Sequence, residues 1–181
     1  MYRKCATEIS VRHQKQVEQS LLELMGKMPY EDISVTQLCR EADISRRVFY
    51  HLFTNKTDAL YALIDHSILD AESYCPEIPD QAVRFFRYWK AHRALLDALL
   101  ENQLTGLLLE RMLWTVLNED YDVRHWIRTE AMENGREILV FVVSGIMGMV
   151  HHWHLGGYKK SPEEMASLVV QMLQPSAEKQ A

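Results

Sequence analysis

Glycine and proline are scarce in this chain, and so are the signs of a β-sheet. The 181 residues include seven Gly and five Pro, and no Gly lies between Met28 and Thr105. No run of alternating apolar and polar residues bounded by turns calls for strands. Leu, Met, Ala, Glu and Gln are abundant instead, and they favour helix. We therefore predict an all-α protein, made of one large helical domain or of a small domain joined to a larger one.

Cysteines and long apolar segments are also few. Cys5, Cys39 and Cys75 are odd in number and form no CxxC pair, so nothing indicates an oxidising compartment. The longest uncharged apolar run has thirteen residues, 138–150, whereas a membrane-spanning helix needs about 20. The first residues, MYRKCATEIS, lack the apolar core of a signal peptide. We expect a soluble, cytoplasmic protein with no membrane partner.

A strongly basic charge, the usual sign of a nucleic-acid partner, is missing too. The formal net charge is −5. Residues 1–58 hold nine Lys/Arg and eight Asp/Glu, a net of +1, whereas residues 59–181 hold eleven and seventeen, a net of −6. Non-specific affinity for DNA should therefore be weak, so that DNA binding would rest on a few placed contacts and on dimerisation.

What the chain does have is a pattern of two short helices within residues 34–58. Ser34 and Gln37 have the spacing of a capping box for the first helix, and Ser45 can cap the second after a short turn. At about 100° per residue, one arc of the second helix carries polar side chains: Arg46, Arg47, Tyr50 and His51. The other arc is apolar: Val48, Phe49, Leu52 and Phe53.

The polar side chains of this second helix are types that contact DNA. Arginine and histidine can donate to guanine edges or phosphate, and a phenol can donate to phosphate. An ordinary solvated helix face is the competing interpretation of such an arc. The pattern favours a helix-turn-helix whose second helix, from Arg46 to Leu52, enters the major groove.

Short motifs in the N-terminal third follow a characteristic order. They are Tyr30-Glu31-Asp32-Ile33, Ser34-Val35-Thr36, Leu38-Cys39-Arg40-Glu41-Ala42, Ile44-Ser45, Phe49-Tyr50-His51-Leu52-Phe53 and Asn55-Lys56. In this order they resemble the tetracycline-repressor (TetR) family of bacterial transcription regulators. The resemblance favours DNA contact over solvation for the polar arc. It implies a homodimer with a helical C-terminal domain that binds an effector, and phosphate contacts from Thr36, Tyr50 and Lys56.

Two positions of the second helix depart from the family pattern. Family members often carry a small residue where this chain has Arg47, and threonine where it has Val48. Arg47 adds a candidate contact to a base or phosphate. Val48 lacks the hydroxyl and offers only a methyl contact, for which the thymine methyl is a partner.

The C-terminal third is similar to a subgroup of the same family that includes activators of dihydroxyacetone kinase operons. The similarity rests on Gly145, Trp153, Gly156 and the segment Ser161-Pro162-Glu163-Glu164-Met165-Ala166. Helices are predicted around residues 81–92, 94–102, 105–118, 123–133 and 135–155, and from Pro162 onward. We divide the chain into a DNA-binding domain, residues 1–68, and an effector-binding and dimerisation domain, residues 69–181.

Two sets of residues in this second domain are candidates for further sites. Aromatic residues are more often core than pocket, but they also suit an apolar effector pocket: Phe86, Trp89, Trp114 and Trp126. Two glycines in an apolar helix indicate either simple tolerance or a close helix approach, within the subunit or across a dimer. With the stripe of the last helix they form the predicted dimer interface, a four-helix bundle from two subunits: Gly145, Gly148, Met165, Leu168 and Met172.

A histidine cluster supplies the only indication of an enzyme. His151 and His154 have a spacing compatible with two metal ligands, but no carboxylate or cysteine lies at i±4 to complete the set. We expect no catalytic residue, no metal and no cofactor. The sequence predicts a one-component transcription regulator, a repressor rather than an activator, that binds a palindromic double-stranded DNA operator and responds to an unknown small molecule. A TetR-fold adaptor or co-activator is the alternative, and a metal-binding enzyme is disfavoured.

Overall fold

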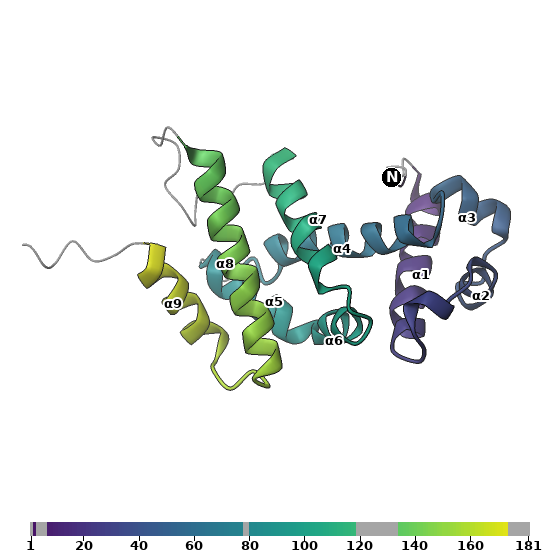
Figure 1. Cartoon of the computed structure of the whole chain (residues 1–181). Helices are drawn as coiled ribbons and strands as arrows, with labels where there is room; N and C mark the ends of the chain where they lie inside the picture. Colours follow the sequence, from purple (N-terminus) through teal and green to yellow (C-terminus); the bar gives the residue numbers. More distant parts are fainter. Residues whose placement is uncertain (1, 3–6, 78–79, 119–133, 174–181) are drawn as a thin grey trace, which may run out of the picture. The chain divides into compact units, whose positions relative to one another are not determined.

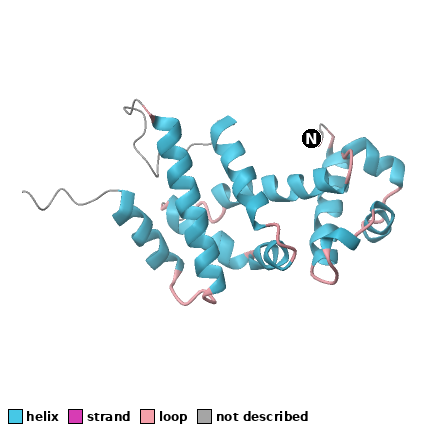
Figure 2. Cartoon of the chain, viewed as in Figure 1, coloured by secondary structure: helices cyan, strands magenta, loops and turns pink. Residues whose placement is uncertain are grey.

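The computed structural model describes residue 2 and residues 7–77, 80–118 and 134–173. All regular structure in these ranges is helical, which confirms the predicted all-α fold (Figures 1 and 2). The described elements, including one 3₁₀ turn, are α1 (Glu8–Met25), η1 (Tyr30–Asp32), α2 (Val35–Glu41), α3 (Arg46–Leu52), α4 (Lys56–Ser73), α5 (Gln81–Ala91), α6 (Arg93–Glu101), α7 (Thr105–Asn118), α8 (Gly135–Leu155) and α9 (Pro162–Leu173). The helix predicted at 123–133 lies outside the described residues.

The chain forms two compact units. The first comprises Met1–Ile68 and Asp97–Arg111, and the second comprises Leu69–Leu96 and Met112–Ala181. The domain boundary that we placed between residues 68 and 69 stays a prediction. The inclusion of residues 97–111 in the first unit was not expected, because nothing in their local pattern ties them to the N-terminal helices.

Side-chain caps start the helices where the sequence predicts them. The Ser34 and Ser45 hydroxyls accept hydrogen bonds from the backbone N–H groups of Gln37 and Val48, at 3.1 and 3.2 Å. The Gln37 amide does not complete the capping box, because it donates to the Met28 sulfur at 3.3 Å. Such caps contribute about 1 kcal/mol each, and in α2 and α3 they fix the start of helices only seven residues long.

The core of the first unit is apolar and involves α1, α2 and α3, which pack against one another. Its central side chains are fully shielded from solvent: Val17, Leu21, Leu38 and Phe49. Burial of each such side chain contributes about 1.5–3 kcal/mol. The short helices therefore depend on α1, since isolated helices of this length are not stable in water.

A buried ion pair joins α4 to α7 within the first unit. Arg111 donates from Nε and Nη2 to the two carboxylate oxygens of Asp65, at 2.7 and 2.5 Å, and both side chains are buried. The Tyr2 hydroxyl donates to the same carboxylate at 2.9 Å, and the guanidinium lies 5.0 Å from the centre of the Tyr61 ring. Burial lowers the pKa of Arg111, but hydrogen bonds to Asp65 outweigh that effect and the pKa is raised.

The second unit is built around α5, which packs against α9 and α8. The fully buried Phe86 ring meets Trp153 of α8 edge to face, with ring centres 5.7 Å apart. The Trp153 indole donates to the Lys160 carbonyl at 3.0 Å. Helix α9 begins with a complete capping box, because Ser161 and Glu164 each accept a backbone N–H bond from the other. This start at Pro162 is the one that the sequence predicts.

Helix α8 is longer than the apolar run within it. An 18-residue window in its 21 residues has a mean hydropathy of 1.5, so by length and composition alone α8 could cross a membrane. The uncharged run 138–150 is only part of this window, and one such helix is weak evidence for a membrane span because core helices pass the same test. Only 28% of the window is buried, so α8 leaves an apolar surface uncovered by the described part of its own chain.

The Asp65–Arg111 pair gives a prediction for stability. Asp65→Asn or Arg111→Met should each lower the free energy of unfolding by about 3–5 kcal/mol, since each leaves a buried charge without its partner. The combined Asp65→Leu/Arg111→Met variant should recover most of the loss, because neither charge remains. Urea denaturation followed by circular dichroism measures these differences.

The exposed ion pair between Lys27 and Glu41, 3.8 Å apart, is the matched control. Its removal should change the free energy of unfolding by less than about 1 kcal/mol. Equal losses from the buried and the exposed pair would contradict the structural role assigned to Asp65 and Arg111.

Candidate nucleic-acid interface

Helix α3 is anchored by one face and open on the other. Phe49, Leu52 and Phe53 are at most 3% exposed, and the Phe49 and Phe53 rings pack with their centres 5.3 Å apart. This is the apolar arc that the sequence predicts, apart from Val48, which is half-buried. The anchor holds the opposite face of α3 in a fixed orientation.

The turn between α2 and α3 sets the angle at which α3 leaves the core. Asp43 adopts a left-handed backbone with φ of 50°, a conformation that Asp tolerates better than most residues. The Ile44 N–H donates to the Cys39 carbonyl at 3.0 Å, and the Asp43 N–H donates to the Arg40 carbonyl at 3.3 Å. Burial raises the pKa of the Cys39 thiol, so this cysteine stays protonated and serves the core.

The open face of α3 carries the four polar residues predicted to contact DNA. Arg46, Arg47 and His51 are exposed, and Tyr50 keeps 48% of its surface in solvent. The Arg46 guanidinium lies 5.8 Å from the centre of the Tyr50 ring, a cation–π distance that orders both side chains. Thr36 is likewise exposed, in the first turn of α2. Donors for phosphate and for base edges are thus available on both short helices.

Lys56 lies at the start of α4 and does not project freely into solvent. Its ammonium donates to the carbonyl oxygens of Tyr30, Glu31 and Ile33, at 2.6, 2.8 and 3.0 Å. It also lies 4.4 Å from the centre of the Tyr30 ring. An ammonium has three protons to donate, and all three have acceptors here. The phosphate contact implied by the family resemblance would have to displace one of these bonds.

Helix α1 contributes to the surface beside α3, which the sequence did not indicate. An open groove of about 560 Å³ lies between the two helices, and we name it the α1–α3 groove. Its lining comprises Ile9, Ser10 and His13 from α1, and Arg47, Val48, Tyr50, His51 and Leu52 from α3. No signal in the sequence places His13 and Arg47 in the same groove, because the two residues lie more than thirty positions apart.

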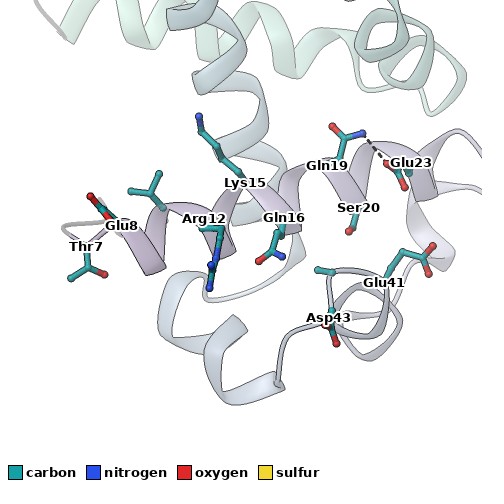
Figure 3. A pocket seen from close by; sticks show the side chains of 12 residues that line it. Thr7, Glu8, Arg12, Lys15, Gln16, Gln19, Ser20, Glu23, Glu41 and Asp43 are labelled. Carbon is teal, nitrogen blue, oxygen red and sulfur yellow. Dashed lines mark hydrogen bonds between the residues drawn. The ribbon is translucent and has the colours of Figure 1, made fainter.

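A second groove lies between α1 and the end of α2 (Figure 3). It has a volume of about 910 Å³ and a lining of mixed sign. The cations Arg12 and Lys15 leave opposite sides of α1 in Figure 3, whereas Glu8, Glu41 and Asp43 supply carboxylates. Charges of both signs give this groove no preference for an anion.

The C-terminal part of the chain matches a known protein family. Residues 77–175, more than half of the chain, match the TetR model described as a transcriptional regulator C-terminal region. The chain belongs to the TetR family of transcription regulators. No curated protein matches it. The helix-turn-helix lies outside the matched residues, so two separate parts of the chain point to the same TetR family, and membership implies DNA binding.

The four aromatic residues considered for a TetR effector pocket differ from one another in burial. Phe86 and Trp89 are fully buried in the second unit, and Trp114 is half-buried on α7. Trp126 lies outside the described residues. The Trp89 indole N–H is buried without a hydrogen-bond acceptor within the described part of the chain, which is uncommon for a buried donor.

The residues considered for a TetR dimer interface also differ in how much of their surface is exposed. Gly145 and Gly148 are exposed on α8, and a Cβ added to either would meet no described atom within 4 Å. No other described helix therefore approaches either glycine closely. Met172 is 72% exposed and Leu168 is half-buried. Met165 is only 5% exposed and packs within its own subunit, so it has little surface left for a partner.

The histidine cluster forms no metal site within the described ranges. His154 Nδ1 lies 2.8 Å from the Tyr158 hydroxyl. No group of three His, Cys, Asp or Glu residues in the ranges 7–77, 80–118 and 134–173 is arranged to hold a metal ion. His154 therefore has a hydrogen-bonding role next to the end of α8.

The three carbonyl contacts of Lys56 give a prediction that separates two roles for this residue. Lys56→Met should lower the free energy of unfolding by about 1.5–3 kcal/mol, because charge-assisted bonds to three carbonyls are lost. A lysine that served phosphate alone would change stability by less than about 0.5 kcal/mol, as surface substitutions usually do. Urea denaturation measures the difference, with Lys27→Met, in the turn after α1, as the exposed control.

Proposed function

We propose that this TetR family regulator is a homodimeric repressor that binds a palindromic DNA operator. The observation that carries the proposal is α3 itself, a helix held by buried Phe49 with Arg46, Arg47, Tyr50 and His51 on its open face. A helix of this kind enters the major groove, where arginine distinguishes guanine from the other bases. Repressor is proposed over activator because repression is the commoner action in the family.

The charge of the chain supports binding as a dimer. With a net charge of −5, general attraction to phosphate is weak, so each α3 has only its placed contacts to rely on. Two copies related by a two-fold axis double these contacts and require half-sites about one helical turn apart. Specificity then comes from a small number of contacts made twice.

The uncovered face of α8 is proposed as the dimer interface, with a second copy of this chain as its occupant. Residues at alternating spacings of four and three share this face: Phe141, Gly145, Gly148, His152 and Leu155. Phe141 and Leu155 are 78% and 59% exposed, and exposed apolar side chains gathered in this way mark interaction sites. The glycines between them let two helices approach closely, and exposed Met172 of α9 extends the surface. A helix covered in this way suits a regulator in the cytoplasm better than a membrane span.

The second unit is proposed to bind the small-molecule effector. The buried Trp89 N–H has no acceptor within the described residues, so an oxygen on a ligand would satisfy it. An effector that favours one arrangement of the dimer would change the separation of the two α3 helices and hence the affinity for DNA. We expect an apolar ligand with at least one hydrogen-bond acceptor.

Substitutions on α3 test the DNA contact. Arg46→Ala and Arg47→Ala should each relax the base preference at one position of each half-site, with a loss of about 1–3 kcal/mol for the preferred duplex. Fluorescence anisotropy with the preferred duplex and with single-base variants of it measures this change. Lys27→Ala, which removes an exposed charge in the turn after α1, is the control. Unchanged affinity in both α3 variants would contradict the assignment.

Substitutions on α8 and α9 test the dimer. Phe141→Lys or Met172→Lys should produce monomers, because a cation would be buried in the apolar interface. Lys159→Glu changes an exposed charge in the turn between α8 and α9 and should leave the dimer intact. Light scattering on the purified proteins gives the mass; a dimeric Phe141→Lys protein would place the interface elsewhere.

A further inference from the structure

The α1–α3 groove has an unusual set of charges for a chain with a net charge of −5. Its described lining includes a guanidinium, Arg47, and two imidazoles, His13 and His51. The hydroxyls of Ser10 and Tyr50 also line it, and none of the described lining residues carries a carboxylate. The groove thus offers hydrogen-bond donors and positive charge, a chemistry that suits an anion.

The start of α1 adds to this potential. Thr7 caps the helix by accepting the Ser10 N–H at 3.2 Å, and its hydroxyl lies 2.8 Å from the Ser10 hydroxyl. The first turn of an 18-residue helix carries the positive end of the helix dipole. Ser10 belongs to that first turn and lines the groove. Glu8 of the same turn lines the groove between α1 and α2 instead, so the dipole and the side chains of the α1–α3 groove favour the same sign of ligand.

The groove is continuous with the open face of α3. Arg47, Tyr50 and His51 belong both to that face and to the groove. A DNA strand that flanks α3 in the major groove would therefore pass the first two turns of α1. Ile9, which is 61% exposed at the edge of the groove, offers an apolar contact for a deoxyribose.

We propose that the α1–α3 groove binds a phosphodiester of the DNA strand beside the major groove, with Ser10, His13 and His51 among its ligands. The inference rests on the proposed DNA binding and extends it, because it assigns α1 to the interface and gives two imidazoles a role with the backbone. Arg47 then faces both the groove and the base edges. Contacts of this kind fix the position of α3 and carry no base preference.

Two imidazoles against a phosphodiester link DNA binding to protons. An imidazole changes charge between pH 5 and 8, and the phosphate favours its protonated form, so affinity should rise as pH falls through this range. The other titratable or charged residues in the described lining of the groove are Arg47, Tyr50 and His51 of α3. Where α1 meets α4, one turn further on, Glu18 pairs with His66 at 2.9 Å. The described residues that line the groove include no carboxylate to compete with the phosphate for the imidazoles.

The experiment measures duplex affinity as a function of salt and pH for the full-length protein. The duplex is one recovered by selection from a random pool, and an unrelated duplex of equal length is measured beside it. His13→Gln and His51→Gln should each lower the salt slope at pH 6 by about 1.8 per dimer, which is about 0.9 for each lost phosphate contact. The wild-type protein should bind about fivefold or more tightly at pH 6 than at pH 8. The double variant, His13→Gln/His51→Gln, should bind equally well at pH 6 and pH 8 and should keep the base preference of the wild-type protein.

Two further variants test whether a general loss of charge or a loss of folding could explain the results. Lys15→Gln removes a full charge about 200° around α1 from His13 and should leave the pH ratio unchanged. His13→Lys carries a permanent charge and should bind at pH 8 more tightly than the wild-type protein does. This gain of affinity requires a folded protein, so loss of folding cannot imitate it.

Three outcomes overturn the inference. The first is a double glutamine variant that keeps the wild-type salt slope and pH ratio. The second is a Lys15→Gln variant whose salt slope falls as much as that of His13→Gln. The third is a His13→Lys variant that binds no more tightly than the wild-type protein at pH 8. If the wild-type protein binds duplex and one of these results appears, only the role of the groove is lost. A wild-type protein that binds no duplex overturns the proposed DNA binding as well.

Discussion

A helix of seven residues does not stay folded in water by itself, so everything that α3 presents depends on the apolar face that holds it. Phe49 is fully shielded and Leu52 and Phe53 nearly so, against a core that includes Val17 and Leu21 of α1. The same helix α1 carries Ser10 and His13 beside α3. One long helix thus supports the short one and completes the surface next to it.

Hydrogen bonds and an ion pair join further elements of the first unit. Lys56, at the start of α4, donates hydrogen bonds to three carbonyls in and next to η1. The ion pair between Asp65 and Arg111 joins α4 to α7 within the first unit. Burial and the Asp65 carboxylate raise the pKa of the Tyr2 hydroxyl, so it remains a donor to that pair. Helices α4, α6 and α7 each contribute residues to both units. These bonds fix the start of α4 against the η1 region and the middle of α4 against α7.

The sequence predicts the local features of this fold well. The caps at Ser34, Ser45 and Ser161 appear where short-range rules place them, and so does the buried arc of α3. The features that it missed join distant residues. The carbonyl contacts of Lys56, the place of residues 97–111 in the first unit and the pairing of His13 with α3 depend on how helices meet. Helical periodicity gives the face on which a residue lies but not the neighbour that the face will meet.

The central claim is that two copies of a single placed helix recognise DNA with two-fold symmetry. Selection of duplexes from a random pool with the purified protein, followed by sequencing, tests it most directly. The account predicts enrichment of an inverted repeat whose half-site centres lie about one helical turn, or a multiple of it, apart. Recovery of no enriched sequence, or of a single site without symmetry, would contradict it.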